Sequence, residues 1–336
     1  MFSAEQYRVL REGAGLITRA DRGLLCLTGG DRLGFLQGVL TNDVATLQAG
    51  QGSYAALLTA NGRMIADMRV LEMGDSTLLD VAADQAASLR ERFDLSIFTE
   101  DVQVADETAR FRQLGVHGPQ AATIVAAAMQ VPGGAAALAA LPMDANQPLD
   151  GVTAIRSGDF GVTGFDLLVP VAAAETLTSA LLNAGAVIVD AAVAEVARIE
   201  SGRPKFGADM DADTIPLEAG IEGRAISLTK GCYVGQEIII RMLHRGQGRV
   251  AKRLVGLILD PAASVPARGD AIKAGERQVG SVTSATRSPA LDRPIAIGYV
   301  HRDFTEPGKE VAIVGASGPQ TATVSGLPFA RSRSRP

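Results

Sequence analysis

The sequence contains no tryptophan, two cysteines and three histidines, and this scarcity excludes several kinds of site. Cys26 and Cys232 lie far apart in the chain and make no disulfide framework, and free thiols fit a reducing compartment such as the cytoplasm. Two thiols also cannot hold zinc or an iron–sulfur cluster by themselves, since such sites usually need four ligands. His117, His244 and His301 show no metal-ligand spacing. We therefore expect no resident metal ion.

The chain also lacks a strong charge imbalance and a long uninterrupted hydrophobic run. Its formal net charge of −5 gives no electrostatic argument for nucleic acid, whose binding depends on clustered Lys and Arg. The longest apolar stretch, residues 121–141, is interrupted by Gln130 and Pro132 and is a poor membrane span. The first eleven residues carry charges and no apolar core of signal-peptide length. We expect a cytoplasmic protein that binds neither membranes nor nucleic acid directly.

With 336 residues the chain is long for a single core, so two or three domains are expected. Through about residue 129, strand-like and helix-like segments alternate, with a hairpin signal at Asn61-Gly62. A variable connection at 130–150 leads to a second such set at 152–202. From Arg249 onward the apolar runs are short, are separated by Gly and Pro, and show no sustained helical period. The pattern predicts the α+β class with largely antiparallel pairing, followed by a small antiparallel barrel or sandwich.

The most informative segment is the octapeptide at residues 230–237, Lys-Gly-Cys-Tyr-Val-Gly-Gln-Glu. Its glycines suit a loop whose backbone approaches another group closely. Lys230 is near enough in sequence to favour the thiolate of Cys232, and Tyr233 could stack on a flat ring or pack into the core. Gln236 and Glu237 could match the donor and acceptor edge of a heterocycle. Residue chemistry alone favours a plainer alternative, a tight loop around a buried thiol, because free cysteine is among the most buried residue types.

The complete octapeptide closely resembles the signature of the YgfZ-type folate-binding proteins. These are relatives of the glycine-cleavage aminomethyltransferase that serve the maturation of iron–sulfur proteins. Other segments extend the resemblance over nearly the whole chain. They are Phe35-Leu36-Gln37-Gly38 with Thr41-Asn42-Asp43-Val44, Asn61-Gly62-Arg63 with Asp67, residues 197–220, and Arg241 after the octapeptide. Taken singly, Asp43 is equally explained as a turn residue and Asp67 as the end of a hairpin strand.

The resemblance implies an aminomethyltransferase-like α+β fold, with two interleaved lobes around a central folate channel and a small C-terminal antiparallel β-barrel. On this basis residues 1–50 and 115–245 are expected to form the first and second lobes, which share the octapeptide loop. Residues 51–114 are expected to form an inserted antiparallel α+β lobe. The barrel is expected at 249–328, and a disordered tail at 329–336.

The resemblance also implies a site for tetrahydrofolate or a derivative of it. The residues expected to hold the folate are Asn42, Asp43, Asp67, Lys230, Gly231, Cys232, Tyr233, Gly235, Gln236, Glu237 and Arg241. Lys230 and Arg241 would lie near negative portions of the folate, and Tyr233 against a ring face. Cys232, assisted by Lys230, would be the reactive group.

The function that this resemblance implies is an accessory role in iron–sulfur cluster assembly or repair, a setting that includes tRNA modification. The expected partners are folate and the iron–sulfur assembly machinery or its client proteins, and we expect a monomer rather than a conventional enzyme. Two departures from the aminomethyltransferase support this interpretation. The enzyme's glutamate that contacts the pterin aligns with Val162, and its aspartate near the folate N5 aligns with Ser88, so the charge handling for one-carbon transfer is in doubt.

Two alternatives stay open at this point. One is a folate-dependent one-carbon transferase, either an aminomethyltransferase or a demethylase. The other is an interaction module that keeps the channel without using folate.

Overall fold

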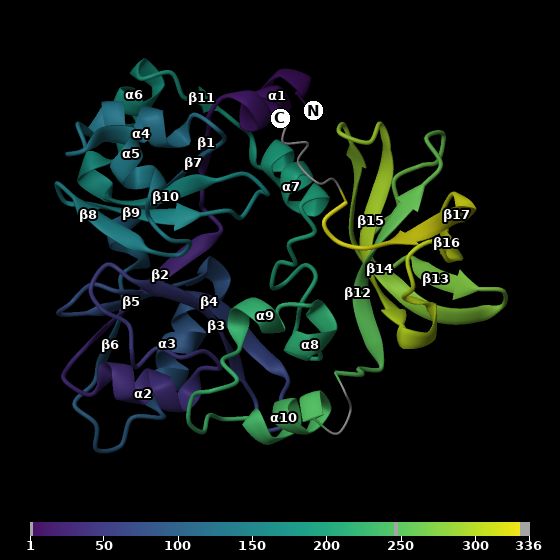
Figure 1. The fold of residues 1–336 in the computed structure, drawn as a ribbon, viewed down its shortest axis with the longest axis horizontal. Coiled ribbons are helices and arrows are strands. Elements are labelled where there is room, and N and C mark those ends of the chain that lie inside the picture. The colour runs from purple at the N-terminus through teal and green to yellow at the C-terminus, as the bar shows by residue number, and fades with distance from the viewer. Residues whose placement is uncertain (1–2, 245–247, 330–336) are drawn as a thin grey trace. The chain divides into compact units, whose positions relative to one another are not determined.

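The computed structural model describes residues 3–244 and 248–329, which fall into two compact units (Figure 1). The first unit contains the chain up to residue 61, residues 65–194 and residues 224–236. The second contains residues 62–64, residues 195–223 and the chain from 237 onward. Two sheets lie in the first unit and a closed barrel lies in the second. Within the described ranges, no helix has the length and apolar character that crossing a membrane requires.

The first sheet has six strands in the order β11-β1-β7-β10-β9-β8, and β11 pairs in parallel with β1 while the other neighbours pair antiparallel. The strands are β1 (Gly15–Thr18), β7 (Phe111–His117), β8 (Asn146–Leu149), β9 (Val152–Ser157), β10 (Gly164–Pro170) and β11 (Val187–Ile188). Alternate residues of β10, Phe165, Leu167 and Val169, point into one apolar core. Covering that core are α4 (Ala121–Met129), α5 (Gly134–Ala139) and α6 (Ala174–Asn183), as Figure 1 shows. Helix α1 (Ala4–Glu12) precedes β1.

The second sheet has five strands in the order β3-β4-β5-β2-β6. They are β2 (Arg22–Thr28), β3 (Gly52–Leu58), β4 (Met64–Glu72), β5 (Thr77–Ala82) and β6 (Gln103–Asp106). Ala66, Met68 and Val70 of β4 pack with residues of α2 (Arg32–Val39) and α3 (Ala86–Asp94) in a buried core. Because side chains alternate along a strand, Asp67 and Arg69 lie on the opposite face of β4.

The faces of the two sheets that are turned away from these helices contact each other. Leu24 and Leu71 of the second sheet form a small apolar cluster with Ile155 and Leu168 of the first. The rest of this contact is polar, because Arg69 of β4 forms ion pairs with residues of both sheets.

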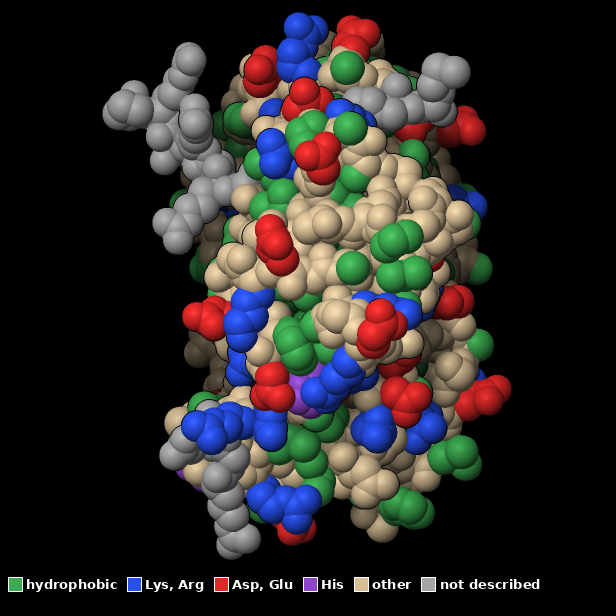
Figure 2. All heavy atoms as spheres, turned by 90° about the vertical axis from the view of Figure 1, so that its right-hand side faces the viewer, with side chains coloured by type: hydrophobic (Ala, Val, Ile, Leu, Met, Phe, Trp, Pro, Cys, Tyr) green, Lys and Arg blue, Asp and Glu red, His purple; other side chains and the backbone are tan. Residues whose placement is uncertain are grey.

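The second unit is dominated by a closed antiparallel barrel with the strand order β12-β15-β14-β13-β16-β17. Its strands are β12 (Lys252–Leu259), β13 (Ala271–Ala274), β14 (Arg277–Ser288), β15 (Arg293–His301), β16 (Glu310–Gly315) and β17 (Gly318–Ser325). Closure pairs every strand edge, and alternate residues such as Val255, Leu257 and Leu259 fill the interior. On the face that Figure 2 shows, acidic and basic side chains are interspersed.

Helix α7 (Ala191–Glu200) ends against the barrel, and Arg198 and Glu200 make buried polar contacts there. Arg198 donates to Asp209 Oδ2 at 2.7 Å and to Ser284 Oγ at 2.9 Å. The hydroxyl of Ser288 donates to Glu200 Oε1 at 2.5 Å. The short helices α8 (Pro216–Ala219) and α9 (Glu222–Ala225) follow, and α10 (Gln236–His244) precedes the barrel.

The prediction of an α+β part followed by an antiparallel barrel is confirmed. We expected one lobe to end at residue 50, but the strand pairing does not follow that boundary. Strand β2 and helix α2 belong with the sheet of residues 51–114, because β2 pairs with β5 and β6, and Phe35 and Leu36 pack into its core. The connection at 130–150 contains α5 and β8.

The C-terminal end also differs from expectation at one residue. Phe329 packs beside Ile199, and its backbone N–H donates to the carbonyl oxygen of Glu200 at 3.1 Å. The remainder of the expected tail, residues 330–336, lies outside the described residues.

The close approach of β7 and β10 predicts how an alanine at Gly164 changes the stability of the fold. A Cβ atom at Gly164 would lie 2.4 Å from His117 Nδ1 and 2.5 Å from the carbonyl oxygen of Val116, whereas one at Gly34 of α2 would meet nothing within 4 Å. We expect Gly164→Ala to lower the free energy of unfolding by about 1–3 kcal/mol through overpacking. Gly34→Ala, the matched control, should raise it by about 0.5–1 kcal/mol. Urea unfolding of both variants measures the difference, and equal effects would contradict the close approach.

Candidate functional site

The octapeptide forms an irregular loop that is fastened to the end of α2 by Lys230. Its ammonium donates to the carbonyl oxygens of Gln37 at 2.7 Å, Leu40 at 2.6 Å and Asn42 at 2.9 Å. The last carbonyls of a helix have no partner within the helix, so an ammonium with three N–H donors suits this position. Lys230 therefore ties the loop to the segment that carries Asn42 and Asp43.

These contacts also define the electrostatics of Lys230. Burial lowers the pKa of its ammonium to about 8, against the opposing effect of Asp43. The Nζ atom lies 5.2 Å from the ring centroid of Tyr233, so the cation also faces the aromatic ring. With three carbonyl acceptors already in place, Lys230 acts as an anchor in this structure.

The remaining octapeptide residues differ in exposure. Cys232 and Gly231 are exposed, whereas Tyr233 is buried and burial raises the pKa of its phenol to about 12. Gly235 has a φ of +85°, a conformation that favours glycine, and it lets the chain turn into α10.

The last residues of the predicted set lie on α10. Gln236 is its first residue, and Glu237 and Arg241 are exposed on this helix, in the second unit.

Asn42 organises the neighbouring backbone with its side-chain amide. Its Nδ2 donates to Ser53 Oγ at 2.9 Å and to the carbonyl oxygens of Tyr54 and Arg224, each at 2.8 Å. Its Oδ1 accepts from the backbone N–H of Asp43 at 2.9 Å. Asn42 thus joins the α2 end, β3 and α9 at one point.

Asp67 lies next to this point and is 8% exposed. The hydroxyl of Tyr54 donates to Asp67 Oδ2 at 2.7 Å, while Asp67 Oδ1 has no hydrogen-bond partner among the described residues. Burial raises the pKa of the Asp67 carboxyl, and nearby Arg22 opposes the shift. The exposed guanidinium of Arg224 lies 4.2 Å from the centroid of the Tyr54 ring.

Consecutive contacts therefore link Lys230, Asn42 and Asp67, which come from three distant motifs, by way of Tyr54. Sequence reasoning missed Tyr54 and Arg224, because neither belongs to a motif that it used. A usable signal was the alternation in β4, where charged residues 67 and 69 interrupt the apolar run from residue 64 to residue 71.

A buried ion network continues from this site between the two sheets. Arg69 pairs with Asp80 and, at 2.7 Å, with Asp166. Arg22 donates to Asp80 Oδ1 at 2.7 Å, and Arg19 lies 3.1 Å from Asp166 Oδ1. Burial alone would raise the pKa of Asp166, but Arg69 and Arg19 hold it well below its usual range.

The outer end of the network reaches the loop between β9 and β10. Arg19 lies 3.3 Å from Asp159 Oδ2, and it sits over the ring of Phe160. Despite burial, Arg69 and Arg19 lower the pKa of the Asp159 carboxyl. His117 Nε2 lies 3.1 Å from Asp166 Oδ1, which places the imidazole in the same network.

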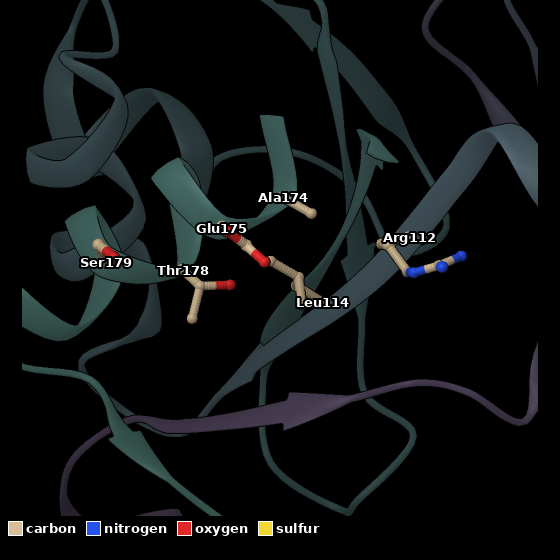
Figure 3. A pocket seen from close by; sticks show the side chains of 6 residues that line it. All are labelled: Arg112, Leu114, Ala174, Glu175, Thr178 and Ser179. Carbon is tan, nitrogen blue, oxygen red and sulfur yellow. The ribbon is translucent and has the colours of Figure 1, made fainter. Parts of the chain in front are cut away.

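The described part of the chain contains no group of three or more His, Cys, Asp or Glu residues placed to hold a metal ion. A hollow of about 450 Å³ lies between β7 and α6, with Leu114 and Glu175 among its lining residues, and Arg112 points away from the helix (Figure 3). The hollow shares no residue with the predicted set, so the linked residues remain the candidate site.

Comparison with known proteins covers both units. The family model described as the GCVT N-terminal domain matches residues 1–230, and the glycine cleavage T-protein C-terminal barrel domain matches residues 252–330. The chain is 32% identical to an aminomethyltransferase of Rubrobacter xylanophilus, over 97% of this chain and 86% of that protein. It is 30% identical to one of Thermosynechococcus vestitus, over 92% of this chain and 82% of the relative.

A solved structure extends the likeness to three dimensions. It is the glycine cleavage system aminomethyltransferase T from Bartonella henselae, with a TM-score of 0.87 and 26% identity. The match covers 98% of this chain and 90% of that one.

The anchoring role of Lys230 is tested by Lys230→Met, which keeps most of the apolar stem and removes the ammonium. We expect the free energy of unfolding to fall by about 1–3 kcal/mol, because three carbonyls lose their donor. Lys309→Met is the control, since Lys309 donates to a single exposed carbonyl, that of Asp303. Urea unfolding compares the two variants, and an effect at Lys230 no larger than at Lys309 would count against the anchor.

The two thiols should differ in reactivity towards iodoacetamide at neutral pH. Cys232 is exposed, whereas Cys26 is partly buried and its thiol pKa is raised by burial and then by Glu107. We expect Cys232 to be alkylated faster, because the thiolate is the nucleophile. Mass spectrometry of time points measures both sites, with Cys232→Ser isolating the rate of Cys26. Equal rates at the two sites would contradict this expectation.

Proposed function

Because the chain belongs to the glycine cleavage T-protein family, we propose that it binds tetrahydrofolate or a derivative in its first unit. The site is the set of linked residues Lys230, Asn42, Tyr54 and Asp67, together with Arg224. Their convergence from distant motifs is the observation that carries the proposal.

The residues present fit such a ligand chemically. Folate combines a planar ring bearing N–H donors with a tail that ends in carboxylates. Asp67 offers a buried acceptor without a partner among the described residues, and Arg224 offers an exposed guanidinium beside an aromatic ring. Lys230 is engaged by three carbonyls, so Arg224 is better placed than Lys230 to meet an anionic tail. When bound, tetrahydrofolate supplies the nitrogen atoms that carry one-carbon groups.

The use of the folate is proposed to be accessory, in iron–sulfur cluster assembly or repair. The hydroxyl of Ser88 is exposed and donates to the carbonyl oxygen of Gln85 at 3.0 Å, and position 162 is the aliphatic Val162. Neither position provides a carboxylate for general acid–base chemistry. The exposed thiol of Cys232 is the proposed reacting group, and the other octapeptide residues hold its loop.

The second candidate function is aminomethyl transfer. It is favoured by the aminomethyltransferases that share 30–32% identity with nearly the whole chain. On this alternative the chain would transfer a one-carbon unit with a carboxylate from another position, because positions 88 and 162 hold serine and valine.

Titration with tetrahydrofolate tests the shared part of both candidates. We expect binding with a dissociation constant near 1 μM, which corresponds to about 8 kcal/mol, measured by calorimetry under reducing conditions. An absence of binding at millimolar folate would reject both candidates. A one-carbon transfer assay then separates them, since turnover supports the aminomethyltransferase and its absence supports the accessory role.

Cys232→Ala serves as the matched variant for the accessory role. It should bind tetrahydrofolate as the unaltered protein does, because removing an exposed thiol leaves almost no cavity. In cells that lack the protein, the variant should fail to restore iron–sulfur enzyme activity. Full restoration would leave the thiol without a role.

A further inference from the structure

Two large hydrophobic side chains on one loop of the first unit are left in solvent. Phe98 is 85% exposed and Leu95 is 80% exposed, the two highest fractions among the large hydrophobic residues that the structure describes. Their loop, residues 95–101, leads from α3 to β6, the edge strand of the second sheet (Figure 1). Single exposed hydrophobic residues are ordinary on a protein surface, but two large ones three residues apart mark a candidate contact surface.

Hydrogen bonds hold this loop, so the exposure of Phe98 belongs to a defined conformation. Glu100 Oε2 accepts from the backbone N–H of Phe98 at 2.9 Å and from that of Thr99 at 3.0 Å. These bonds lower the pKa of the Glu100 carboxyl. The backbone N–H of Ser96 donates to the carbonyl oxygen of Phe93 at 2.9 Å, which continues the end of α3. A loop that is already ordered loses little conformational entropy when a partner binds.

The far end of the loop is fastened to the start of α2. The backbone N–H of Asp101 donates to Asp31 Oδ2 at 2.8 Å, and that of Gly30 donates to Asp101 Oδ2 at 2.9 Å. Between the two fastened ends, Ile97 packs against the buried core of the second sheet. The loop therefore turns Ile97 towards the core and leaves the next residue, Phe98, in solvent.

Acidic side chains accompany the two hydrophobic ones. Exposed carboxylates lie on the loop, on the last turn of α3 and just before α2. They are Asp31, Glu91, Asp94, Glu100 and Asp101. Two arginines, Arg90 and Arg92, lie among them, and Arg90 already pairs with Asp94 at 3.1 Å. The surface carries a net negative charge, which favours a partner with Lys and Arg around the contact.

The same charge disfavours two other occupants. Membrane leaflets that carry anionic lipid would repel these carboxylates. A second copy of this chain, docked with two-fold symmetry, would bring the acidic surface against itself. A different protein with a basic surface is the occupant that the charges fit.

We propose that residues 95–101 form the docking site of a protein partner, with Phe98 and Leu95 entering an apolar pocket bordered by Lys and Arg side chains. Phe98 is the anchor, because aromatic residues in desolvated pockets carry much of the binding energy of protein–protein contacts. The loop shares no residue with the proposed folate site, so this inference goes beyond the proposed function.

The first measurement is whether the fold needs Phe98. We expect Phe98→Ser to leave the urea midpoint unchanged, since the side chain is exposed. Ile97→Ser, the neighbouring control, should lower the midpoint, because Ile97 packs against the core. A midpoint that falls as far for Phe98→Ser would make Phe98 a structural residue and overturn the proposal.

The second measurement identifies the partner by cross-linking. The full chain, with photoreactive benzoylphenylalanine at position 98, is irradiated in its native host cells, and the adducts are identified by mass spectrometry. The control carries the same residue at position 143, because Met143 is an exposed hydrophobic residue of the same unit outside the loop. We expect a protein that is cross-linked from position 98 and not from position 143. An adduct with a second copy of the chain, or none from position 98, would overturn the proposal.

The third measurement is the affinity for that protein, purified and titrated by calorimetry. We expect Phe98→Ser to weaken binding about 10-fold or more, and Met143→Ser to leave it unchanged. Raising NaCl from about 50 mM to about 300 mM should weaken binding of the unaltered chain, because the carboxylates act through charge. Equal affinities of Phe98→Ser and the unaltered chain, or binding that salt does not change, would refute the docking site.

Two further probes separate this inference from its alternatives. The unaltered chain should not sediment with vesicles of phosphatidylcholine and phosphatidylserine, and sedimentation that depends on Phe98 would assign the loop to lipid instead. Phe98→Ser should bind tetrahydrofolate as the unaltered chain does. A chain that fails to bind tetrahydrofolate but still needs Phe98 for its protein partner would reject the proposed function and leave this inference standing.

Discussion

Arg69 lies between two buried carboxylates, Asp80 of its own sheet and Asp166 of the neighbouring sheet, and the candidate site depends on this arrangement. Breaking one partner of a buried ion pair strands a charge, at a cost of about 3–5 kcal/mol, so the pairs specify how the two sheets meet. Arg69 shares the inner face of β4 with Asp67. The same constraint that positions the sheets therefore also positions the unpaired carboxylate.

A second constraint sets the place of the octapeptide. The carbonyls at the end of α2 need donors, and Lys230 donates to those of Gln37 and Leu40 and to that of Asn42 just beyond the helix, from 188 to 193 residues away in the sequence. This leaves Cys232 exposed one residue before the buried Tyr233. Because Lys230 and Tyr233 hold the loop on either side of Cys232, the thiol can be exposed while the loop stays in place.

The family and the site residues bear on different parts of the function. Family membership and a TM-score of 0.87 to an aminomethyltransferase establish the fold, while the use of the ligand depends on a few side chains. Position 162 holds valine and position 88 holds serine, and the buried Asp67 has one carboxylate oxygen, Oδ1, without a hydrogen-bond partner among the described residues.

The sequence by itself determined the α+β class and the C-terminal barrel, because these follow from local periodicity and turn residues, whereas the motifs at the site were recognised by their resemblance to a known family. Only the tertiary structure decided that β2 and α2 belong with the second sheet, since strand pairing is non-local. It also decided that Lys230 binds backbone carbonyls, which no sequence letter records. Tyr54, Arg224 and the buried ion network became visible for the same reason: their partners lie up to 182 residues away, and contact at that separation is set by packing.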